Sequence, residues 1–310
     1  MGDDGTTGIL GVGGVSGTDG TLAYDRSNAL SESNTISGGV AVSQIGSGAT
    51  TFTANNTYTG GTTISNGRLY ANNATGSTGS GTVTVDSSGT IAGLGTVALS
   101  GTHGISLTGS GAIVPGGVQS GSVANGNLTI DTTSITAHST ILSLNGASGN
   151  PANNASLTFT LGSGVHLNAN QEIDTGSQLV VTGPDGMAVA NTIAFNVGGG
   201  AGNLVNINDL VGDGLVRNGE YVLIDGSNTT YTGLTLNLYP TITDGYNYGY
   251  QITGGLAIGS GAYDASLLFL KGDNIDIEVA PEPSTWALLL ASLALLALVQ
   301  FRRRRASPSV

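Results

Sequence analysis

The stretch GTVTVDSSGTIAGLGTVALSG, residues 81–101, contains the pattern that decides the fold. Val83 and Val85 alternate with threonine, so the two valines point to one face of a short strand and the threonines to the other. Gly89 then lies in a turn before Ile91 opens the next apolar run. Such strands are too short to bury a core singly, but stacked coils of them cover one another. The stretch therefore predicts a β-solenoid.

The same alternation continues along the chain, and the composition agrees with it. Glycine occurs 52 times in 310 residues, charged residues make up 9% and aromatic residues 5%. Glycine allows the positive backbone angles of tight turns and threonine suits half-buried strands, so the composition favours many short strands over helices. Further apolar positions of the alternation are Leu128, Ile130, Leu142, Leu144, Leu157, Phe159 and Leu161.

The charges are distributed unevenly and exclude one class of function. Half of the eight basic residues are Arg302 to Arg305, so removing these four from the net charge of −12 leaves −16 for residues 1–301. Such an acidic body repels phosphate backbones, and this excludes nucleic-acid binding. Cysteine is absent, which excludes disulfides, thiolate metal sites and a cysteine nucleophile.

Residues 35–73, TISGGVAVSQIGSGATTFTANNTYTGGTTISNGRLYANN, contain the run NTYTGGTTI at 56–64. This segment resembles the autotransporter-associated β-strand repeat, and SQLVVTG at 177–183 and NGEYVLIDG at 218–226 are similar to later parts of such passengers. The resemblance implies a right-handed parallel β-helix. We expect a passenger-like solenoid over residues 1–213 with a repeat-like core at about 35–100, then last rungs and a β-rich cap over 214–280.

The C-terminal segment PEPSTWALLLASLALLALVQFRRRR has the features of a membrane segment. Residues 286–301 contain no charge and are rich in leucine and alanine, and a helix of that length measures about 24 Å, near the ~30 Å hydrocarbon core. We expect one short transmembrane helix at 285–301. The arginines that follow stay on the cytoplasmic side, which puts the β-rich body across the inner membrane.

The order of these features resembles the PEP-CTERM sorting signal of Gram-negative bacteria. The matching positions are the triad Pro281, Glu282 and Pro283, the apolar segment 284–301, and the cluster Arg302, Arg303, Arg304 and Arg305, with 306–310 as a short tail. The resemblance implies removal of the tail by an exosortase-type membrane peptidase, then release or attachment at the cell surface, often in bacteria that make exopolysaccharide. The alternative is an ordinary tail anchor.

The N-terminal residues MGDDGTTGIL lack the features of an export signal. Two aspartates stand where a signal peptide has basic residues, and no apolar run follows. A body across the inner membrane needs export, so we expect a signal for Sec-type export upstream of residue 1.

Few residues are candidates for chemistry. His166 alternates with apolar neighbours, while His103 and His138 fall in turn-like stretches, so we expect solvent-exposed histidines and no metal site or cofactor. The local acidic groupings are Asp209 with Asp213, and Asp273 with Asp276 and Glu278. They lack calcium-loop spacing, so we expect them to solvate turns and strand faces.

Three tyrosines in GYNYGYQ form the one candidate contact with carbohydrate. Tyr246, Tyr248 and Tyr250 alternate, and tyrosine rings on one strand face can stack on sugars. An aromatic face that closes the cap is the alternative.

The sequence as a whole predicts a non-enzymatic protein of the cell surface or extracellular matrix, with a structural or adhesive role in an exopolysaccharide matrix, as in a biofilm. The alternative is a β-helix polysaccharide lyase or hydrolase. That alternative needs paired carboxylates on neighbouring rungs, or a cation close to carboxylates.

Overall fold

The computed structural model describes an all-β protein. It covers residues 1–279 except 87, 120–121, 125, 137–139, 147–153, 162–175, 184–190, 198–202, 210–218, 227–228, 233–237, 244–246, 253–255, 260–264 and 272–273. Within these ranges every regular element is a strand, and most strands pair in parallel. The predicted fold class is therefore confirmed as all-β with parallel strands, an arrangement that fits a β-solenoid.

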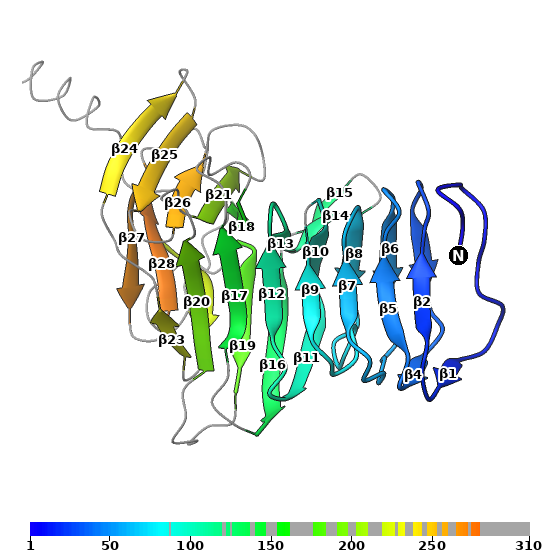
Figure 1. Cartoon of the computed structure of the whole chain (residues 1–310). Helices are drawn as coiled ribbons and strands as arrows, with labels where there is room; N and C mark the ends of the chain where they lie inside the picture. The colour runs from blue at the N-terminus through cyan, green and yellow to red at the C-terminus, as the bar shows by residue number, and fades with distance from the viewer. Residues whose placement is uncertain are drawn as a thin grey trace, which may run out of the picture.

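Sheet I contains eight parallel strands, which run side by side along the molecule in Figure 1. Their order in the sheet follows their order in the chain, with other strands between them in sequence. They are β2 (Thr21–Tyr24), β5 (Ala41–Gln44), β7 (Thr62–Ile64), β9 (Val83–Val85), β12 (Ile105–Thr108), β17 (Thr140–Gly146), β20 (Asn191–Val197) and β23 (Thr229–Thr232).

Sheets II and III take the intervening strands. Sheet II contains β3 (Leu30–Glu32), β6 (Ala49–Phe52), β8 (Arg68–Ala71), β10 (Thr90–Gly93), β13 (Ala112–Pro115), β18 (Ser156–Leu161), β21 (Asn203–Asp209), β26 (Leu256–Gly259), β25 (Asn247–Ile252) and β24 (Leu238–Thr243). Sheet III contains β11 (Thr96–Gly101), β16 (Asn127–Ile135), β19 (Gln178–Thr182), β22 (Gly219–Gly226), β28 (Asn274–Val279) and β27 (Ala265–Lys271). Two small pairs, β1 (Val15–Gly17) with β4 (Ile36–Gly38) and β14 (Gly117–Gln119) with β15 (Ser122–Ala124), complete the described strands.

Successive strands of the chain belong to sheets I, II and III in a repeating order, as expected for a chain that winds into a coil. From β9 onward one strand of sheet I is followed by one of sheet II and one of sheet III, four times over, with the small pair β14 and β15 inserted between β13 and β16. Paired residues in the early coils lie 19 to 22 positions apart, as for Ala49 with Arg68 and Val83 with Ile105. Ile105 pairs with Leu142, 37 positions on, because later coils contain longer segments between their strands.

Inward-facing positions of successive coils stack into apolar rows. In sheet II the row Leu69, Ile91, Ile113 and Leu157 is fully buried. Burial of each such side chain contributes about 1.5–3 kcal/mol of transfer free energy. The predicted alternation is confirmed at the described positions, because the following residues are all buried: Val83, Val85, Leu128, Ile130, Leu142, Leu144, Leu157 and Phe159.

One glycine shows how closely neighbouring turns approach. Gly67 has a φ of +63°, and a Cβ built there would lie 2.2 Å from the carbonyl oxygen of Gly48 in the preceding coil. That carbonyl accepts a hydrogen bond of 3.0 Å from the backbone N–H of Arg68. A side chain at position 67 would therefore separate two coils that are joined at this turn.

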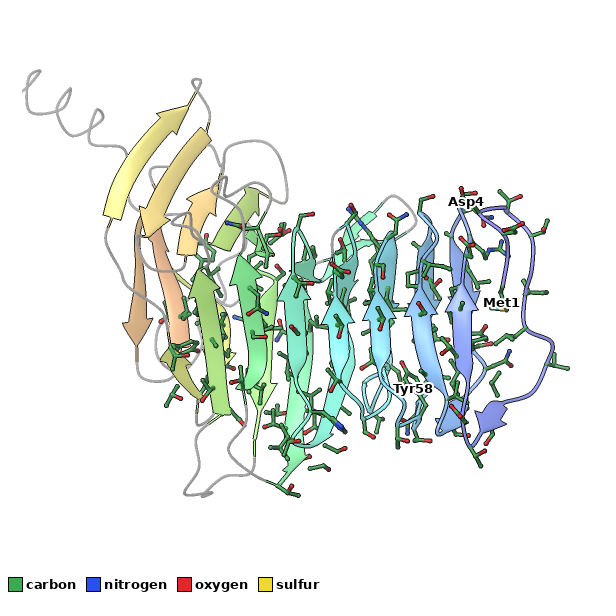
Figure 2. The ribbon with its side chains drawn as sticks, viewed as in Figure 1. Met1, Asp4 and Tyr58 are labelled. Atoms are coloured by element: carbon green, nitrogen blue, oxygen red, sulfur yellow. The ribbon has the colours of Figure 1, made fainter. Side chains whose placement is uncertain are left out.

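The first residues of the chain pack along the first complete coil. The Met1 ammonium donates to the carbonyl of Ala23, and Met1, labelled in Figure 2, packs against the core cluster. Arg26 is 6% exposed and donates to the carbonyls of Thr6, at 2.5 Å, and Gly8. These contacts hold residues 1–8 along the edge of sheet I that β2 forms.

At the other end of the described chain the pairing becomes antiparallel. β22 pairs in parallel with β19 but antiparallel with β28, which is itself antiparallel to β27. β24, β25 and β26 likewise pair antiparallel, while β26 continues the parallel ladder of β21.

The predicted transmembrane helix at 285–301 lies outside the described residues. Across the described part of the chain there is no helix with the length and apolar character needed to cross a bilayer.

Candidate functional sites: an axial groove and the C-terminal tail

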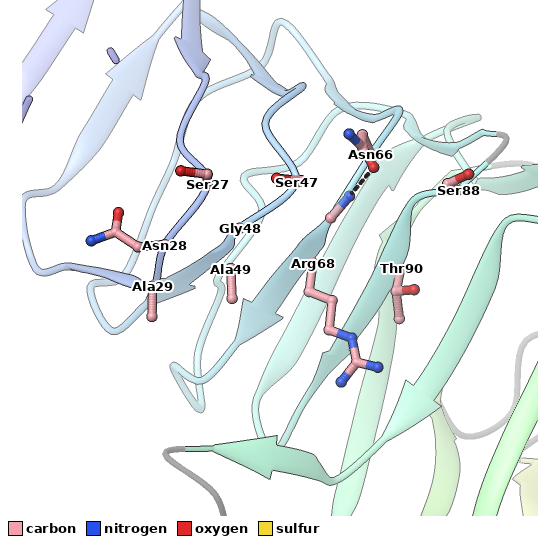
Figure 3. Close-up of a pocket in the computed structure, with 11 residues that line it drawn as sticks. Ser27, Asn28, Ala29, Ser47, Gly48, Ala49, Asn66, Arg68, Ser88 and Thr90 are labelled. Atoms are coloured by element: carbon pink, nitrogen blue, oxygen red, sulfur yellow. Dashed lines mark hydrogen bonds between the residues drawn. The ribbon is translucent and has the colours of Figure 1, made fainter. Parts of the chain in front are cut away.

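An open groove of about 550 Å³ follows the turns that join sheet I to sheet II (Figure 3). It crosses four successive coils, because its lining comes from the residues just before and at the start of β3, β6, β8 and β10. The lining residues are Ser27, Asn28, Ala29, Ser47, Gly48, Ala49, Asn66, Gly67, Arg68, Ser88 and Thr90.

The groove is built from one short sequence pattern used four times. Each coil supplies a serine or asparagine, then a glycine or asparagine, then the first outward-facing residue of a sheet II strand. The four copies are SNAL at 27–30, SGAT at 47–50, NGRL at 66–69 and SGTI at 88–91. The fourth residue of each copy points inward, and Leu69 and Ile91 are fully buried there. The packing of the core therefore fixes the position of the polar turn outside it.

Arg68 is the one charged side chain in the groove lining. It is exposed, and strand register places it between Ala49 on β6 and Thr90 on β10. Both neighbours have short side chains, and in Figure 3 the Arg68 side chain extends away from Asn66 and past the level of Ala49 and Thr90. Its Nη1 donates to the hydroxyl oxygen of Tyr70 over 3.5 Å, which is long for a hydrogen bond.

At one end of the groove, Asn28 is held by the buried Arg26. The Nε and Nη2 atoms of Arg26 donate to Asn28 Oδ1 over 3.0 and 2.8 Å. At its middle, the backbone N–H of Gly67 donates to Asn66 Oδ1 over 2.9 Å. Hydrogen bonds thus orient both asparagine carboxamides, and the Nδ2 of Asn28 also donates to the carbonyl oxygen of Thr6 over 3.4 Å.

The chemistry of the lining is that of hydrogen-bond exchange. Serine and threonine hydroxyls donate and accept, asparagine amides do both, and arginine donates only. The lining contains no carboxylate, histidine or aromatic ring. It can hold a polar ligand but offers no general acid or base and no stacking platform.

Two of the predicted carbohydrate-contact residues lie on a described strand. Tyr248 and Tyr250 belong to β25, where they pair with Ile242 and Pro240 of β24. Tyr246 lies outside the described residues.

His103 lies in the turn after β11, as the sequence predicts, but it is half-buried. Its Nδ1 is 3.1 Å from the carbonyl oxygen of Ser80, one coil earlier, so the ring joins two coils. His138 and His166 lie outside the described residues. Over the described ranges, no three histidine, aspartate or glutamate side chains come together as a group that could hold a metal ion.

The prediction that the acidic groupings solvate the surface is wrong for Asp276. This residue is fully buried in β28, opposite Val222 of β22 and Phe269 of β27. Asp276 therefore lies in a strand that pairs on both of its edges. Asp209 ends β21 and Glu278 lies on β28 opposite Glu220, whereas Asp213 and Asp273 lie outside the described residues.

The groove residues were not predicted as a site from the sequence. Their signal is the recurrence, at intervals of 19 to 22 residues, of a serine or asparagine followed by a glycine or asparagine just before a short run of strand-forming residues. Each copy alone is an ordinary turn signal. Only the strand register shows that the four copies stand side by side.

The remaining predicted site is the C-terminal tail, whose key residues all lie outside the described residues. They are Pro281, Glu282, Pro283, Arg302, Arg303, Arg304 and Arg305. Residues 279–305 match the PEP-CTERM protein-sorting motif. A PEP-CTERM tail is the signal of a secreted protein that an exosortase sorts, and it implies export to the cell envelope or surface in a Gram-negative bacterium. No curated protein matches the chain.

Proposed function

We propose that this chain is a non-enzymatic structural or adhesive protein of the bacterial cell surface or extracellular matrix. The β-solenoid body is the functional part, and the PEP-CTERM tail delivers it. The observation that carries the proposal is the pairing of this sorting motif with a body of stacked parallel strands.

In this proposal the tail acts as a temporary anchor. A helix at 285–301 holds the exported chain in the inner membrane, with Arg302 to Arg305 on the cytoplasmic side. The body reaches the other side by Sec-type export, and an exosortase cuts near the triad Pro281 to Pro283. The free body then joins an exopolysaccharide matrix.

The proposed body is a stiff, right-handed solenoid of the autotransporter-repeat kind. Parallel crossover connections are right-handed in about 98% of cases, which supports this handedness. The antiparallel strands β24, β25, β27 and β28 form its cap, because pairing of a terminal edge prevents further strands from adding to it.

Adhesion follows from a regular polar surface. Around the second and third coils the exposed residues include Thr53, Thr57, Thr59 and Thr63. Each hydroxyl makes a weak contact with a hydrated polymer, but a rigid array makes many contacts at once, and linked weak contacts give a much higher overall affinity.

The delivery part of the proposal is tested with a matched pair of proline variants in the native host. Pro281→Ala combined with Glu282→Ala removes the triad, whereas Pro308→Ala changes a proline beyond the arginines. We expect the triad variant to stay in the membrane fraction and Pro308→Ala to reach the surface or medium like the wild type. Normal release of the triad variant would contradict the proposal.

The matrix part is tested by deleting the gene and comparing biofilm cohesion. We expect a deletion strain to lose cohesion and the purified body to leave the viscosity and reducing ends of the matrix polysaccharide unchanged. A steady rise in reducing ends, or a fall in viscosity, would instead make the protein a polysaccharide-degrading enzyme.

A further inference from the structure

We propose that the groove between sheets I and II binds one extended chain of a neutral, hydroxyl-rich polysaccharide, which lies along the coil axis. The inference rests on the proposed adhesive function and gives it a site. It concerns the four turns that begin at Ser27, Ser47, Asn66 and Ser88.

The periodicity of the groove points to a polymer. Neighbouring strands lie about 4.8 Å apart, so the four turns repeat a similar polar set at that interval. A pyranose unit in an extended glycan advances by a comparable length. One sugar per coil can therefore meet equivalent hydroxyl and amide groups, whereas a compact small molecule would use one or two turns.

The lining chemistry points to a neutral chain. Serine, threonine and asparagine both donate and accept, and this matches sugar hydroxyls, which also do both. A carboxylate only accepts, and the net charge of −16 over residues 1–301 repels an acidic polymer. Arg68 donates through a planar guanidinium, whose paired N–H groups suit two adjacent hydroxyl oxygens.

The geometry of the groove also predicts how affinity depends on the length of the polysaccharide. The groove is open and its lining has no aromatic ring, so each sugar is held by exposed hydrogen bonds alone. Single contacts of that kind contribute little in water. Affinity must rise with chain length until the four turns are occupied.

The test is affinity electrophoresis of the tail-free body, residues 1–280, in gels that contain hydroxyethyl cellulose, a soluble neutral glucan, with polygalacturonate as the acidic probe. Ser47→Tyr places a large side chain in the groove, and Arg68→Ala removes its cation. Thr63→Tyr adds the same ring at an exposed position of β7 in sheet I and is the matched control. Circular dichroism melting establishes that each variant is folded.

We expect the wild type and Thr63→Tyr to be retarded by the neutral glucan and not by polygalacturonate. Arg68→Ala should raise the dissociation constant about tenfold, because the charge-assisted hydrogen bonds of the guanidinium are lost. Ser47→Tyr should abolish retardation. Ser47 is exposed, and Ser47→Ala keeps the groove open, so this variant should retain most of the binding.

Two results would overturn the inference. Equal retardation of the wild type, Ser47→Tyr and Arg68→Ala would place polymer binding elsewhere and leave the adhesive function standing. Absence of retardation by the neutral glucan, or stronger retardation by polygalacturonate, would exclude a neutral chain as the ligand. The proposed delivery and matrix role is judged separately, by the membrane-fraction and biofilm experiments.

Discussion

The carboxamide of Asn56 donates to the backbone carbonyl of Ser77, 2.8 Å away in the next coil. Its Oδ1 accepts a 2.8 Å hydrogen bond from the backbone N–H of Ile36 in the preceding coil. The side chain is 3% exposed. One amide therefore joins three coils from inside, at the first position of the NTYTGGTTI run.

Replacement of Asn56 by alanine should destabilise the body strongly. The change leaves the Ile36 N–H and the Ser77 carbonyl without their partner in a buried site, which we expect to cost about 2–4 kcal/mol of unfolding free energy. Urea unfolding followed by circular dichroism measures the loss. The matched control is Asn55→Ala, at an exposed neighbour, which should stay within about 0.5 kcal/mol of the wild type. Equal effects of the two variants would contradict a bridging role.

Loss of the hydroxyl should have opposite effects on stability at Tyr24 and at Tyr58. The Tyr24 hydroxyl is buried and has no hydrogen-bond partner among the described residues, whereas that of Tyr58 lies 2.5 Å from Thr62 Oγ1. Tyr24→Phe should be neutral or stabilise by about 1 kcal/mol, because an unsatisfied buried group is removed. Tyr58→Phe should destabilise by about 1 kcal/mol. Thermal unfolding of both variants measures these changes in stability. A clear loss of stability in Tyr24→Phe would contradict the prediction and reveal a partner for the Tyr24 hydroxyl.

The same two tyrosines make the body sensitive to alkali. Burial raises the pKa of Tyr24, with further increases from the nearby Glu32 and Tyr58, and burial raises the pKa of Tyr58 against the effect of its hydrogen bond with Thr62. Below pH ~10 both phenols are neutral in the folded and unfolded chain, so they cause no pH dependence. Above that pH only the unfolded chain loses the protons, and stability falls by about 1.4 kcal/mol per pH unit for each group.

Urea unfolding at pH 9, 10 and 11 measures this effect. The double variant Tyr24→Phe with Tyr58→Phe should show a shallower fall in unfolding free energy above pH 10 than the wild type. An identical pH dependence would mean that both phenols ionise as readily in the folded chain as in the unfolded one.

The sequence predicted the class of fold because its main signals are local. Alternation at Val83 and Val85 and the turn at Gly89 report strand faces and turns directly, and both agree with the structure. The run at 56–64 carries the resemblance to the autotransporter-associated repeat, but the sequence does not explain what these residues do in the fold. No local pattern indicates that Asn56 and Tyr58 are buried, and only the stacking of the coils shows it.

The groove and the burial of Asp276 could not be predicted because both depend on register. Arg68 stands between Ala49 and Thr90 only because their strands pair at those positions. Asp276 lies on β28 between β22 and β27, a placement that the local sequence does not indicate. The sorting motif could be predicted, and the match over residues 279–305 confirms it, since its signal is a linear order of residue types that needs no fold.

Gly67 tests the close approach of the turns. Gly67→Ala forces a side chain onto a φ of +63° and toward the Gly48 carbonyl, and should cost at least about 2 kcal/mol of unfolding free energy. Gly11→Ala is the control, because a Cβ there meets no atom within 4 Å. Comparable melting temperatures of the two variants would contradict the tight stacking of the coils at position 67.

The central claim is that the tail delivers the body to the surface and is then removed. Mass spectrometry of the C-terminal peptide, from protein recovered in the surface and medium fractions of the native host, tests it most directly. The account predicts a new C-terminus near residues 281–285, with the peptide containing Arg302 to Arg305 missing from both fractions. An intact C-terminus at Val310, found in the membrane fraction alone, would contradict the account and make this a tail-anchored protein.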